Sequence, residues 1–311
     1  MLTVLFATHN GASTLPVVLE AYIGIQAPAG GWKLVIVDNG SSDRSKEIVS
    51  SYAGELPLTL LQENRRGKNS AINTGLQEIE GDLVVLTDDD AIPQPDWLAK
   101  FRETADAQPD FAVFGGSVVA RWPADPPPWI FQWVPLGPVF ALTNPAWPEG
   151  PVSPQHIFGP NMAVRAEVFR QGACFDSSIG PSSGSYTMGS ETEFTLRLVE
   201  AGGKCWHCKQ AVVAHIIRPQ QMAKHWVLNR AVRYGRSRYR LEVSRSGLEP
   251  KRLFGYPRYL VREIATEWLR AQKFRVAGSE EALFKAQWRI KFLIGQAIEA
   301  RASGADTSAR V

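Results

Sequence analysis

Four short apolar segments in the first hundred residues alternate with segments of helical periodicity, and this alternation limits the fold more than any other feature. Such apolar runs, rich in Val, Leu and Ile, predict strands that are buried on both faces. Strand, helix and strand at this spacing predict right-handed crossovers, and therefore an α/β fold whose mainly parallel sheet has helices on both faces. The predicted strands are residues 2–8, 33–38, 58–62 and 82–87, and the predicted helices are residues 13–23, 43–52 and 69–79.

Polar residues follow each of the four predicted strands. Ser41, Ser42 and Asp43 in the second of these loops are candidate caps of the next helix. Ligands of open parallel sheets bind beyond the carboxyl ends of the strands, so we expect the four loops to share one crevice. No Walker-type loop and no GxGxxG motif follows the first strand, so phosphates must be held mainly by side chains and a metal. The loops are Thr8-His9-Asn10, Asp38-Asn39-Gly40, residues 63–68 and Asp88-Asp89-Asp90.

The three adjacent carboxylates at residues 88–90 repel one another and lose hydration at the end of a buried strand. A divalent cation offsets that cost. Alternate residues of an extended turn point the same way, so Asp88 and Asp90 can face one ion while Asp89 turns toward the scaffold. For the triplet alone, the alternative is an acidic cluster that caps a helix predicted at residues 95–105. The other three polar strand ends favour the cation.

Six motifs in residues 1–215 together resemble the family 2 glycosyltransferases. One motif is a weak signal, but six in this order are specific. The resemblance implies a GT-A fold and inverting transfer of a sugar from a nucleotide diphosphate donor, often UDP-linked, with Mg²⁺ or Mn²⁺. The motifs are VLFATHNGASTLPVVLEAY, VIVDNGSSDRSKEI, ENRRGKNSAINTGL, VVLTDDDAIPQPDWL, GPNMAVRAEVF and GSETEFTLRLVEAGG.

The resemblance also implies roles for single residues. A divalent ion held by Asp90 would stabilise the negative charge that develops on the departing nucleotide diphosphate. For His215, the alternative is a polar side chain satisfied at a strand end. Two positions depart from the family pattern, because His9 replaces the more usual Tyr and Ser190-Glu191 replaces Glu-Asp. The implied donor or nucleotide residues are Thr8, Asn10, Asp38, Lys68, Asn73, Asp88 and Asp89, and the implied metal ligands are Asp90, Asp88 and His215.

Residues 188–203 predict a helix with Phe194, Leu198 and Val199 on its apolar side and a stop at Gly202-Gly203. Glu191 and Glu193 then lie in or just before the first turn, where the helix dipole tolerates anions. The resemblance implies that Glu191 is the catalytic base, one methylene longer than the usual Asp. Glu193 is expected to bond an acceptor hydroxyl. Capping of the helix is the alternative for both.

Residues 121–160 contain 11 of the 21 prolines and four of the ten tryptophans. This composition excludes regular sheet or helix throughout the segment. The segment is either a rigid excursion whose Trp side chains pack on the domain or an acceptor loop. In the second case an exposed ring stacks on a sugar or meets a lipid tail. The candidates for that contact are Trp129 and Trp133, with Trp122 and Trp147 in the same segment.

Composition divides the chain into a GT-A domain at residues 1–217 and a basic helical extension at 218–311. The first domain has a nucleotide-sugar half (1–100) and an acceptor half (101–217). Between Arg218 and Arg262 there are 12 Lys and Arg but 2 Glu, a local charge of +10, whereas the whole chain has +3. The basic region is either a solvated helix surface or a site for an anionic membrane or phosphate-bearing substrate. No motif indicates nucleic acid.

The extension is expected to be helical, with breaks near residues 247–250 and 278–279. Its last apolar array is more typical of a core stripe than of a membrane anchor, and no apolar run reaches the ~20 residues of a membrane span. This array consists of Phe284, Trp288, Phe292 and Ile298.

Three cysteines and the absence of an apolar leader after Met1 favour a reduced, cytoplasmic location. The basic C-terminal region would allow peripheral contact at the inner face of the membrane. Cys205-Trp-His-Cys208 has no second ligand pair to complete a zinc site, so we interpret both cysteines as packed side chains.

The sequence therefore predicts a metal-dependent, inverting, hexosyltransferase-type enzyme. It would move a sugar from a nucleotide diphosphate donor, UDP in preference, to a glycan or lipid-linked acceptor in polysaccharide or surface-glycan synthesis. One alternative is a nucleotidyltransferase that makes sugar nucleotides, although such enzymes normally carry a Gly-rich basic loop where this chain has THNGAST. The other is a non-catalytic carbohydrate-binding protein of the same fold, which the change at Glu191 permits.

Overall fold

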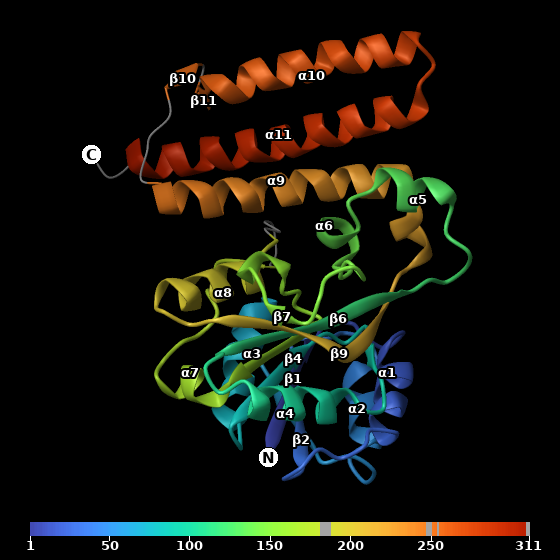
Figure 1. Cartoon of the computed structure of the whole chain (residues 1–311), viewed down its shortest axis with the longest axis vertical. Helices are drawn as coiled ribbons and strands as arrows, with labels where there is room; N and C mark the ends of the chain where they lie inside the picture. Colours follow the sequence, from blue (N-terminus) through green and yellow to red (C-terminus); the bar gives the residue numbers. More distant parts are fainter. Residues whose placement is uncertain (181–187, 247–250, 254, 309–311) are drawn as a thin grey trace. The chain divides into compact units, whose positions relative to one another are not determined.

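The computed structural model describes residues 1–180, 188–246, 251–253 and 255–308 (Figure 1). The described residues form two compact units. Unit 1 comprises those within Met1–Trp122, Phe140–Ser185 and Ser190–Ile217, and unit 2 those within Pro123–Val139, Tyr186–Gly189 and Arg218–Val311. Part of the Pro- and Trp-rich segment, residues 123–139, thus clusters with unit 2.

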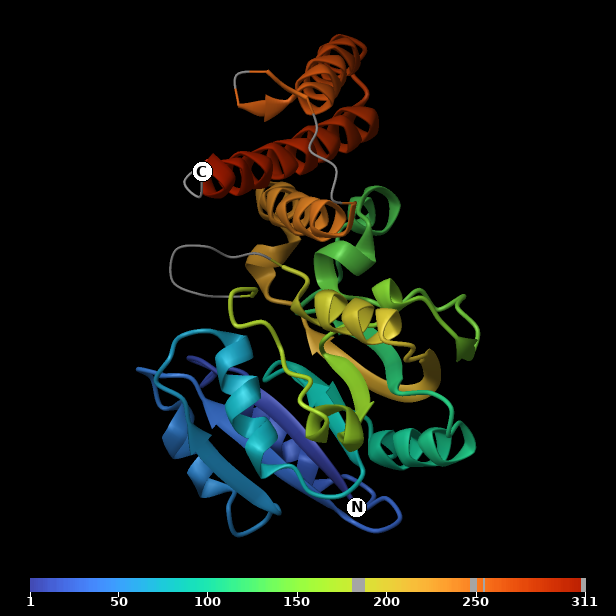
Figure 2. The ribbon, with the colours of Figure 1, turned by 90° about the vertical axis from the view of Figure 1, so that its left-hand side faces the viewer.

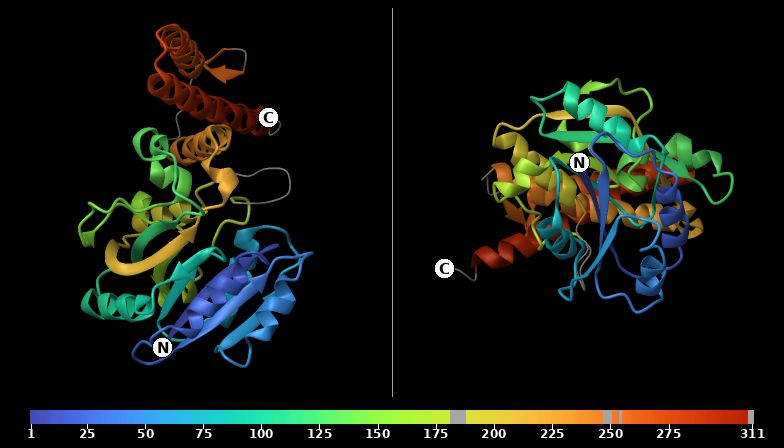
Figure 3. Two further views of the ribbon diagram at one scale, coloured as in Figure 1. Left: turned by 90° about the vertical axis from the view of Figure 1, so that its right-hand side faces the viewer. Right: turned by 90° about the horizontal axis from the view of Figure 1, so that it is seen from below.

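The first half of unit 1 is a parallel sheet in the order β3-β2-β1-β4. Its strands agree with the predicted segments to within one residue, because uninterrupted Val, Leu and Ile runs can be buried on both faces only in such a sheet. Helices α1 and α2 lie on one face and α3 on the other (Figures 2 and 3). The elements are β1 (Leu2–Thr8), α1 (Leu15–Ile23), β2 (Trp32–Asp38), α2 (Ser45–Ser51), β3 (Leu58–Gln62), α3 (Lys68–Gly75), the short helix η1 (Leu76–Glu78) and β4 (Leu83–Thr87).

The second half of the sheet is mixed rather than parallel. β8 runs antiparallel to β4 and to β6, whereas β9 is parallel to β6 and antiparallel to β5. In the β5–β9 pair, Ala91 lies opposite His215, and this register brings the acidic triplet beside the end of β9. The elements are β5 (Ala91–Pro93), α4 (Trp97–Ala107), β6 (Val113–Arg121), β7 (Gly150–Pro151), η2 (Pro154–His156), β8 (Asn161–Arg165), α7 (Ala166–Arg170), α8 (Ser190–Glu200) and β9 (Cys205–Ile216).

The predicted caps of α2 are wrong. The N-cap residue is Arg44, and it makes no capping bond through its side chain. Asp43 instead accepts hydrogen bonds from the backbone N–H groups of Ser45 (3.0 Å) and Ala12 (3.1 Å). Asp43 therefore connects the loop after β1 to the loop after β2. Sequence rules for helix starts do not predict such a contact between loops.

Three stacked aromatic rings hold α8 against the core of unit 1. Phe194 is fully buried, and its ring centroid lies 4.3 Å from that of Phe175 and 5.6 Å from that of Phe169. Leu198 and Val199 pack on the same cluster, as the helical spacing predicted. Because Phe194 is one turn beyond Glu191, this packing fixes the start of α8, where the two predicted acidic residues lie in the first turn.

The Pro- and Trp-rich segment is largely irregular, as predicted. Its regular parts are the end of β6, the short helices α5 (Pro128–Trp133) and α6 (Leu136–Phe140), β7 and η2. Its tryptophans pack on protein side chains. Trp122 meets the ring of Phe140 edge-on, and Trp147 stacks on His156 with 4.2 Å between ring centroids.

Unit 2 is built on three long helices, with α11 between α9 and α10 (Figure 1). The predicted break at residues 278–279 is confirmed, whereas the one at 247–250 lies outside the described residues. Ile298 is 45% exposed, so its assignment to the buried stripe was wrong, although Phe284 is buried. No helix in the described part of the chain is both long and apolar enough to cross a bilayer. The elements are η3 (Pro219–Met222), α9 (Lys224–Ser246), β10 (Arg252–Leu253), β11 (Tyr256–Pro257), α10 (Arg258–Val276) and α11 (Glu280–Ser308).

Two glycines allow α9 and α11 to approach closely. A Cβ atom at Gly235 of α9 would overlap the backbone carbonyl oxygen of Phe292 on α11, and one at Gly295 would overlap that of Val232. Both obstacles are backbone atoms, which cannot rotate away. Only glycine at these positions permits this helix spacing.

Gly235→Ala and Gly295→Ala should each lower the free energy of unfolding by about 1–3 kcal/mol, the usual cost of overpacking. The gain in helix propensity from Ala, up to ~1 kcal/mol, is not enough to offset a backbone overlap. Urea unfolding followed by far-UV circular dichroism measures the change. Gly54→Ala is the control, since no atom lies within 4 Å of a Cβ there. If all three variants are equally stable, the close helix contact is not required.

Candidate functional site

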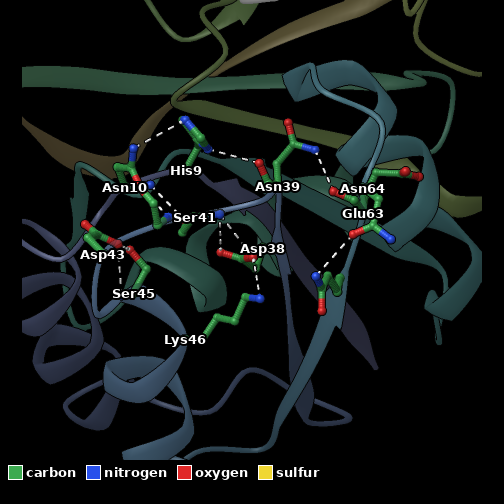
Figure 4. A network of polar contacts seen from close by, with 12 residues as sticks. His9, Asn10, Asp38, Asn39, Ser41, Asp43, Ser45, Lys46, Glu63 and Asn64 are labelled. Carbon is green, nitrogen blue, oxygen red and sulfur yellow. Dashed lines mark hydrogen bonds and ion pairs between the residues drawn. The ribbon is translucent and has the colours of Figure 1, made fainter.

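Hydrogen bonds join the loops after β1 and β2 (Figure 4). Asn10 has a positive φ of 56°, and this turn lets its backbone N–H donate to Oγ of Ser41 (2.9 Å) while its Oδ1 accepts from the N–H of Ser42 (2.8 Å). Asp38, at the end of β2, is 1% exposed, accepts from the N–H of Ser41 at 3.3 Å and lies 3.6 Å from Nζ of Lys46. Thus Asp38 closes a turn here; its contact with a nucleobase stays a prediction.

Asn39 connects the same loops to the one after β3, a role that was not predicted. Its Nδ2 donates to the carbonyls of Glu63 and Arg65, and its Oδ1 accepts from the N–H of Gly67 (2.8 Å). The backbone carbonyl of Asn39 lies 3.0 Å from Nδ1 of His9 (Figure 4). Its position directly after a strand was the available signal, but an amide that bridges three loops cannot be recognised from sequence.

Glu63 anchors the third loop to α3. Arg65 and Thr74 both donate to its carboxylate, and these bonds lower the pKa of Glu63 to about 2. The loop that leads to Lys68 is therefore braced at its start as well as through Asn39.

Asp89 is the member of the acidic triplet that contacts β1. Thr8, which is 2% exposed, donates from Oγ1 to Oδ2 of Asp89 at 2.6 Å. A Cβ atom at Gly11 would lie 2.6 Å from the same carboxylate oxygen, so the glycine leaves the room that this contact needs.

Lys68 lies between two carboxylates that are far apart in the sequence. Its Nζ is 2.6 Å from Oδ1 of Asp88 and 2.8 Å from Oε1 of Glu191. Burial alone would lower the pKa of Lys68, but the charges of Asp88 and Glu191 raise it well above its ordinary value. Burial raises the pKa of Asp88 despite the opposing effect of Lys68. This Asp88–Lys68–Glu191 bridge joins the triplet to the start of α8.

A small recess adjoins the bridge. Gly159 gives Glu191 room in it, because a Cβ atom at this glycine would lie 2.6 Å from Cδ of Glu191. Glu193, two residues on, instead pairs with Arg197 on the surface of α8, at 2.7 Å. The recess is lined by Lys68, Asn69, Ile72, Leu86, Thr87, Gly159, Met162, Phe175 and Glu191.

Asp90 and His215 form a second pair at the edge of the triplet. Nε2 of His215 is 3.4 Å from Oδ1 of Asp90, and its Nδ1 is 2.8 Å from the carbonyl oxygen of Phe140. Burial alone would lower the pKa of His215, but Asp90 and this carbonyl raise it above the usual value. Because a carbonyl can only accept, Nδ1 carries a proton, and Nε2 of the neutral ring presents a lone pair.

This donor set fits part of a divalent metal site. A carboxylate oxygen and an imidazole nitrogen are both ligands for Mn²⁺. Among the described residues, however, no group of three His, Cys, Asp or Glu side chains could by itself hold a metal ion. A metal at Asp90 would therefore take further ligands from water and substrate. Asp88 contacts Lys68 in this structure, so its role as a second metal ligand stays a prediction.

Two asparagines of α3 bond to the segment before residue 180 and to the start of α8. Asn73 uses both ends of its side-chain amide on the backbone of Phe175, at 2.7 and 2.9 Å, and its contact with the donor stays a prediction. Asn69 was not predicted, yet it is 2% exposed and joins the Asp176 and Ile179 carbonyls to the hydroxyl of Ser190.

Trp129 and Trp133 lie in unit 2, where both rings pack on Phe284. Nζ of Lys224 is 4.8 Å from the ring centroid of Trp133. The structure shows the packing arrangement for these tryptophans, and contact with an acceptor stays a prediction.

Residues 3–170 match the family model described as glycosyl transferase family 2. The glucosyl-dolichyl phosphate glucuronosyltransferase of Haloferax volcanii is 26% identical over 212 residues, 66% of each chain. An undecaprenyl-phosphate 4-deoxy-4-formamido-L-arabinose transferase of Pectobacterium carotovorum is 31% identical over 107 residues, 33% of each chain. The alignments thus span a third to two thirds of these relatives.

Solved structures show the same fold at low identity. The mannosyltransferase PcManGT from Pyrobaculum calidifontis, in complex with GDP-Man and Mn²⁺, has a TM-score of 0.61 and 21% identity, with 96% of this chain and 86% of that chain covered. S. aureus TarS 1-349 in complex with UDP has a TM-score of 0.54 and 14% identity, with 100% and 92% covered. The predicted GT-A fold is confirmed.

Lys68→Met should lower the free energy of unfolding at pH 8 by about 2–3 kcal/mol. This is less than the ~3–5 kcal/mol that breaking a fully buried pair costs, because the Lys68 side chain is 24% exposed. Lys46→Met is the control, since the Lys46 side chain is 44% exposed and should contribute no more than ~1 kcal/mol. Chemical denaturation at several pH values measures both.

The deficit of Lys68→Met should shrink toward pH 5. The pKa of Asp88 is already raised in the folded state, and loss of Lys68 raises it further. A raised folded-state pKa contributes stability at low pH and loses it as pH rises through that pKa. Repulsion among the acidic groups is therefore greatest at pH 8. A deficit that does not change with pH would contradict the charge-balance role of Lys68.

Proposed function

The chain belongs to glycosyl transferase family 2, and we propose that it transfers a sugar from a nucleotide diphosphate donor to a hydroxyl of a lipid-linked acceptor, with inversion at the anomeric carbon. The observation that carries this proposal is the Asp88–Lys68–Glu191 bridge. It brings the acidic triplet, on which the donor phosphates depend, within reach of the carboxylate that the family pattern gives as the base. The groups that stabilise the leaving nucleotide diphosphate and the base that activates the acceptor would then lie at one centre.

The donor binds over the loops after β1, β2 and β3. Their bonds through Asn10, Asn39 and Asp38 supply a braced polar surface without a phosphate-binding glycine loop. Uridine is the proposed nucleoside, because a carboxylate oxygen of Asp38 can accept the N3–H of uracil in a charge-assisted bond. Lys68 adds a positive charge beside the diphosphate.

The acceptor hydroxyl needs a base as it attacks the sugar on the side opposite the leaving group. Glu191 serves as that base. Its extra methylene, compared with Asp, is accommodated by Gly159, where any side chain would collide with the Glu191 carboxyl group. The Lys68 contact and the Phe194 stack hold the carboxylate in one orientation.

Asp90 and His215 hold Mn²⁺ or Mg²⁺ together with the donor. When bound, such an ion stabilises the negative charge that develops on the departing nucleotide diphosphate. Asp90 contributes a charged oxygen, and Nε2 of His215 becomes a ligand once its proton is lost. The Phe140 carbonyl keeps the ring oriented through Nδ1.

A polyprenyl-phosphate-linked acceptor is supported by the names of the relatives, which specify dolichyl phosphate or undecaprenyl phosphate. The proposed base, Glu191, also indicates which group of the acceptor attacks the sugar. A phosphate monoester is already largely ionised at neutral pH, since its second pKa is about 6, and it can attack without a base. A hydroxyl, in contrast, needs a base. The position of the Glu191 carboxylate therefore favours a hydroxyl acceptor, such as a sugar already attached to the lipid.

Glu191→Gln should retain donor affinity and melting temperature while kcat falls by roughly 10²- to 10⁴-fold, the usual loss for a general base. A panel of nucleotide sugars with polyprenyl-phosphate-linked sugars as acceptors provides the assay, which follows release of the nucleoside diphosphate. Glu193→Gln is the matched control. It removes one carboxylate from the same helical turn, but that carboxylate pairs with Arg197, so kcat should stay within a few-fold of wild type.

Near wild-type kcat in Glu191→Gln would refute its role as base, and a product that retains the donor's anomeric configuration would refute single displacement. Release of pyrophosphate instead of the nucleoside diphosphate would indicate a nucleotidyltransferase. Binding of every nucleotide sugar without turnover would indicate a non-catalytic protein.

Asp90→Asn should weaken Mn²⁺-dependent binding of UDP more than the ~10- to 100-fold that loss of an outer-shell partner costs. The reason is that a charged oxygen ligand becomes a neutral amide. Isothermal titration calorimetry with and without Mn²⁺ measures the effect, and Asp110→Asn, at an exposed position of the same unit, is the control. An unchanged Mn²⁺ dependence in Asp90→Asn would contradict the assignment.

A further inference from the structure

Helix α10 carries a row of exposed apolar side chains, which we call the α10 stripe: Val261, Ala265, Trp268, Leu269 and Val276. The side chains of Val261, Trp268, Leu269 and Val276 are 37%, 54%, 63% and 90% exposed. Steps of four, three, one and seven residues keep all five on one side of a helix. A single exposed apolar residue is ordinary, but several on one side of a helix mark an interaction surface.

The α10 stripe faces away from the core of unit 2. Leu260 and Ala271, on the other side of α10, are 0% and 4% exposed. Leu260 packs in one cluster with Leu293 and Ala297 of α11. Figure 2 likewise shows α11 along one side of α10. The core of unit 2 therefore does not need the α10 stripe for its own packing.

Basic residues border the α10 stripe. Arg258, Arg262 and Lys273 are exposed and have no ion-pair partner among the residues that the structure describes. The acidic groups of α10 are otherwise engaged, because Glu263 pairs with Arg289 of α11 and Glu267 pairs with Arg270. The exposed face of α10 thus combines apolar side chains with positive charge that the helix itself does not neutralise.

We infer that the α10 stripe docks on the surface of an anionic lipid bilayer. A helix with this composition lies in the interface, where its apolar side chains enter the boundary of the acyl chains and its cations meet lipid phosphates. Trp268 suits this position because an indole ring is apolar and carries one N–H donor for the hydrated layer. The contact holds the chain at the membrane without a spanning helix.

A second copy of the chain is a poorer partner for this face. In a two-fold symmetric contact, each surface meets itself, so Arg262 and Lys273 of one copy would approach the same cations of the other. The paired Glu263 and Glu267 could not offset that repulsion without breaking their present contacts. Lipid phosphates instead supply the complementary charge.

Sedimentation of the full-length chain with vesicles tests the inference. The vesicles are phosphatidylcholine alone or phosphatidylcholine with phosphatidylglycerol, and they contain no nucleotide and no lipid-linked sugar. Wild type should bind the anionic vesicles at least about tenfold more strongly than the neutral ones, and the difference should fall with added salt. This experiment measures no sugar transfer. Absence of vesicle binding would therefore not contradict the proposed enzymatic function, and absence of transfer would not contradict the membrane contact.

Two variants separate the apolar and the charged contributions. Trp268→Ser combined with Leu269→Ser should abolish most of the binding. Arg262→Gln combined with Lys273→Gln should lower it by roughly 30-fold, because each near-surface cation contributes about fivefold. Ile23→Ser, which removes an apolar side chain that is 41% exposed in unit 1, and Lys204→Gln combined with Lys209→Gln are the matched controls. They should bind like wild type, and circular dichroism confirms that each variant is folded.

Equal binding to neutral and anionic vesicles, or equal loss in the control variants, would overturn the inference. So would a wild-type dimer in analytical ultracentrifugation that becomes a monomer in Trp268→Ser with Leu269→Ser and shows no vesicle binding. In that case the α10 stripe would be a self-association surface.

Discussion

The contact of Lys68 with Asp88 and Glu191 is the interaction on which the candidate site depends. These residues come from α3, the end of β4 and the first turn of α8, and like-charged carboxylates at such a short separation would repel one another without a cation between them. The site is thus partly neutralised before any ligand binds. A divalent metal and the two phosphate charges of a nucleotide sugar cancel each other, so their joint arrival changes the charge of the site little, whereas either one alone would disturb it.

Two glycines are as important for the geometry of this site as its polar side chains. Gly11 leaves space for the contact between Thr8 and Asp89, and Gly159 leaves space for the Glu191 carboxyl group. Stacking of Phe194 on Phe175 then fixes α8 from the core side. The acidic residues are held by packing, by hydrogen bonds and by one cation, so that the fold rather than the ligand sets their positions.

The sequence predicted those features that follow from local periodicity. Strand boundaries, the convergence of strand ends and the acidic first turn of α8 were of this kind. Contacts between distant residues were not predictable. Nothing local in Lys68 indicates its two carboxylate partners, and nothing local in Asn39 indicates the three partners of its amide. Likewise, nothing in Asn73 indicates that Phe175 occupies its amide. The prediction that Ile298 belongs to the buried stripe of α11 was wrong. This helix packs on α5 near its start and against α9 and α10 farther on, so one straight row does not describe its buried face.

An acceptor attached to a lipid is confined to a bilayer, whereas a nucleotide sugar diffuses in water. An enzyme that joins the two gains from weak attachment to the surface, because attachment raises the effective concentration of the acceptor without any new contact at the catalytic site. A few exposed apolar side chains and cations suffice for reversible binding of this kind. In the proposed function and the inferred membrane contact, the two units have separate tasks: Glu191 and the acidic triplet in unit 1 would determine which bond is made, and α10 in unit 2 would determine at which surface the chain meets its acceptor.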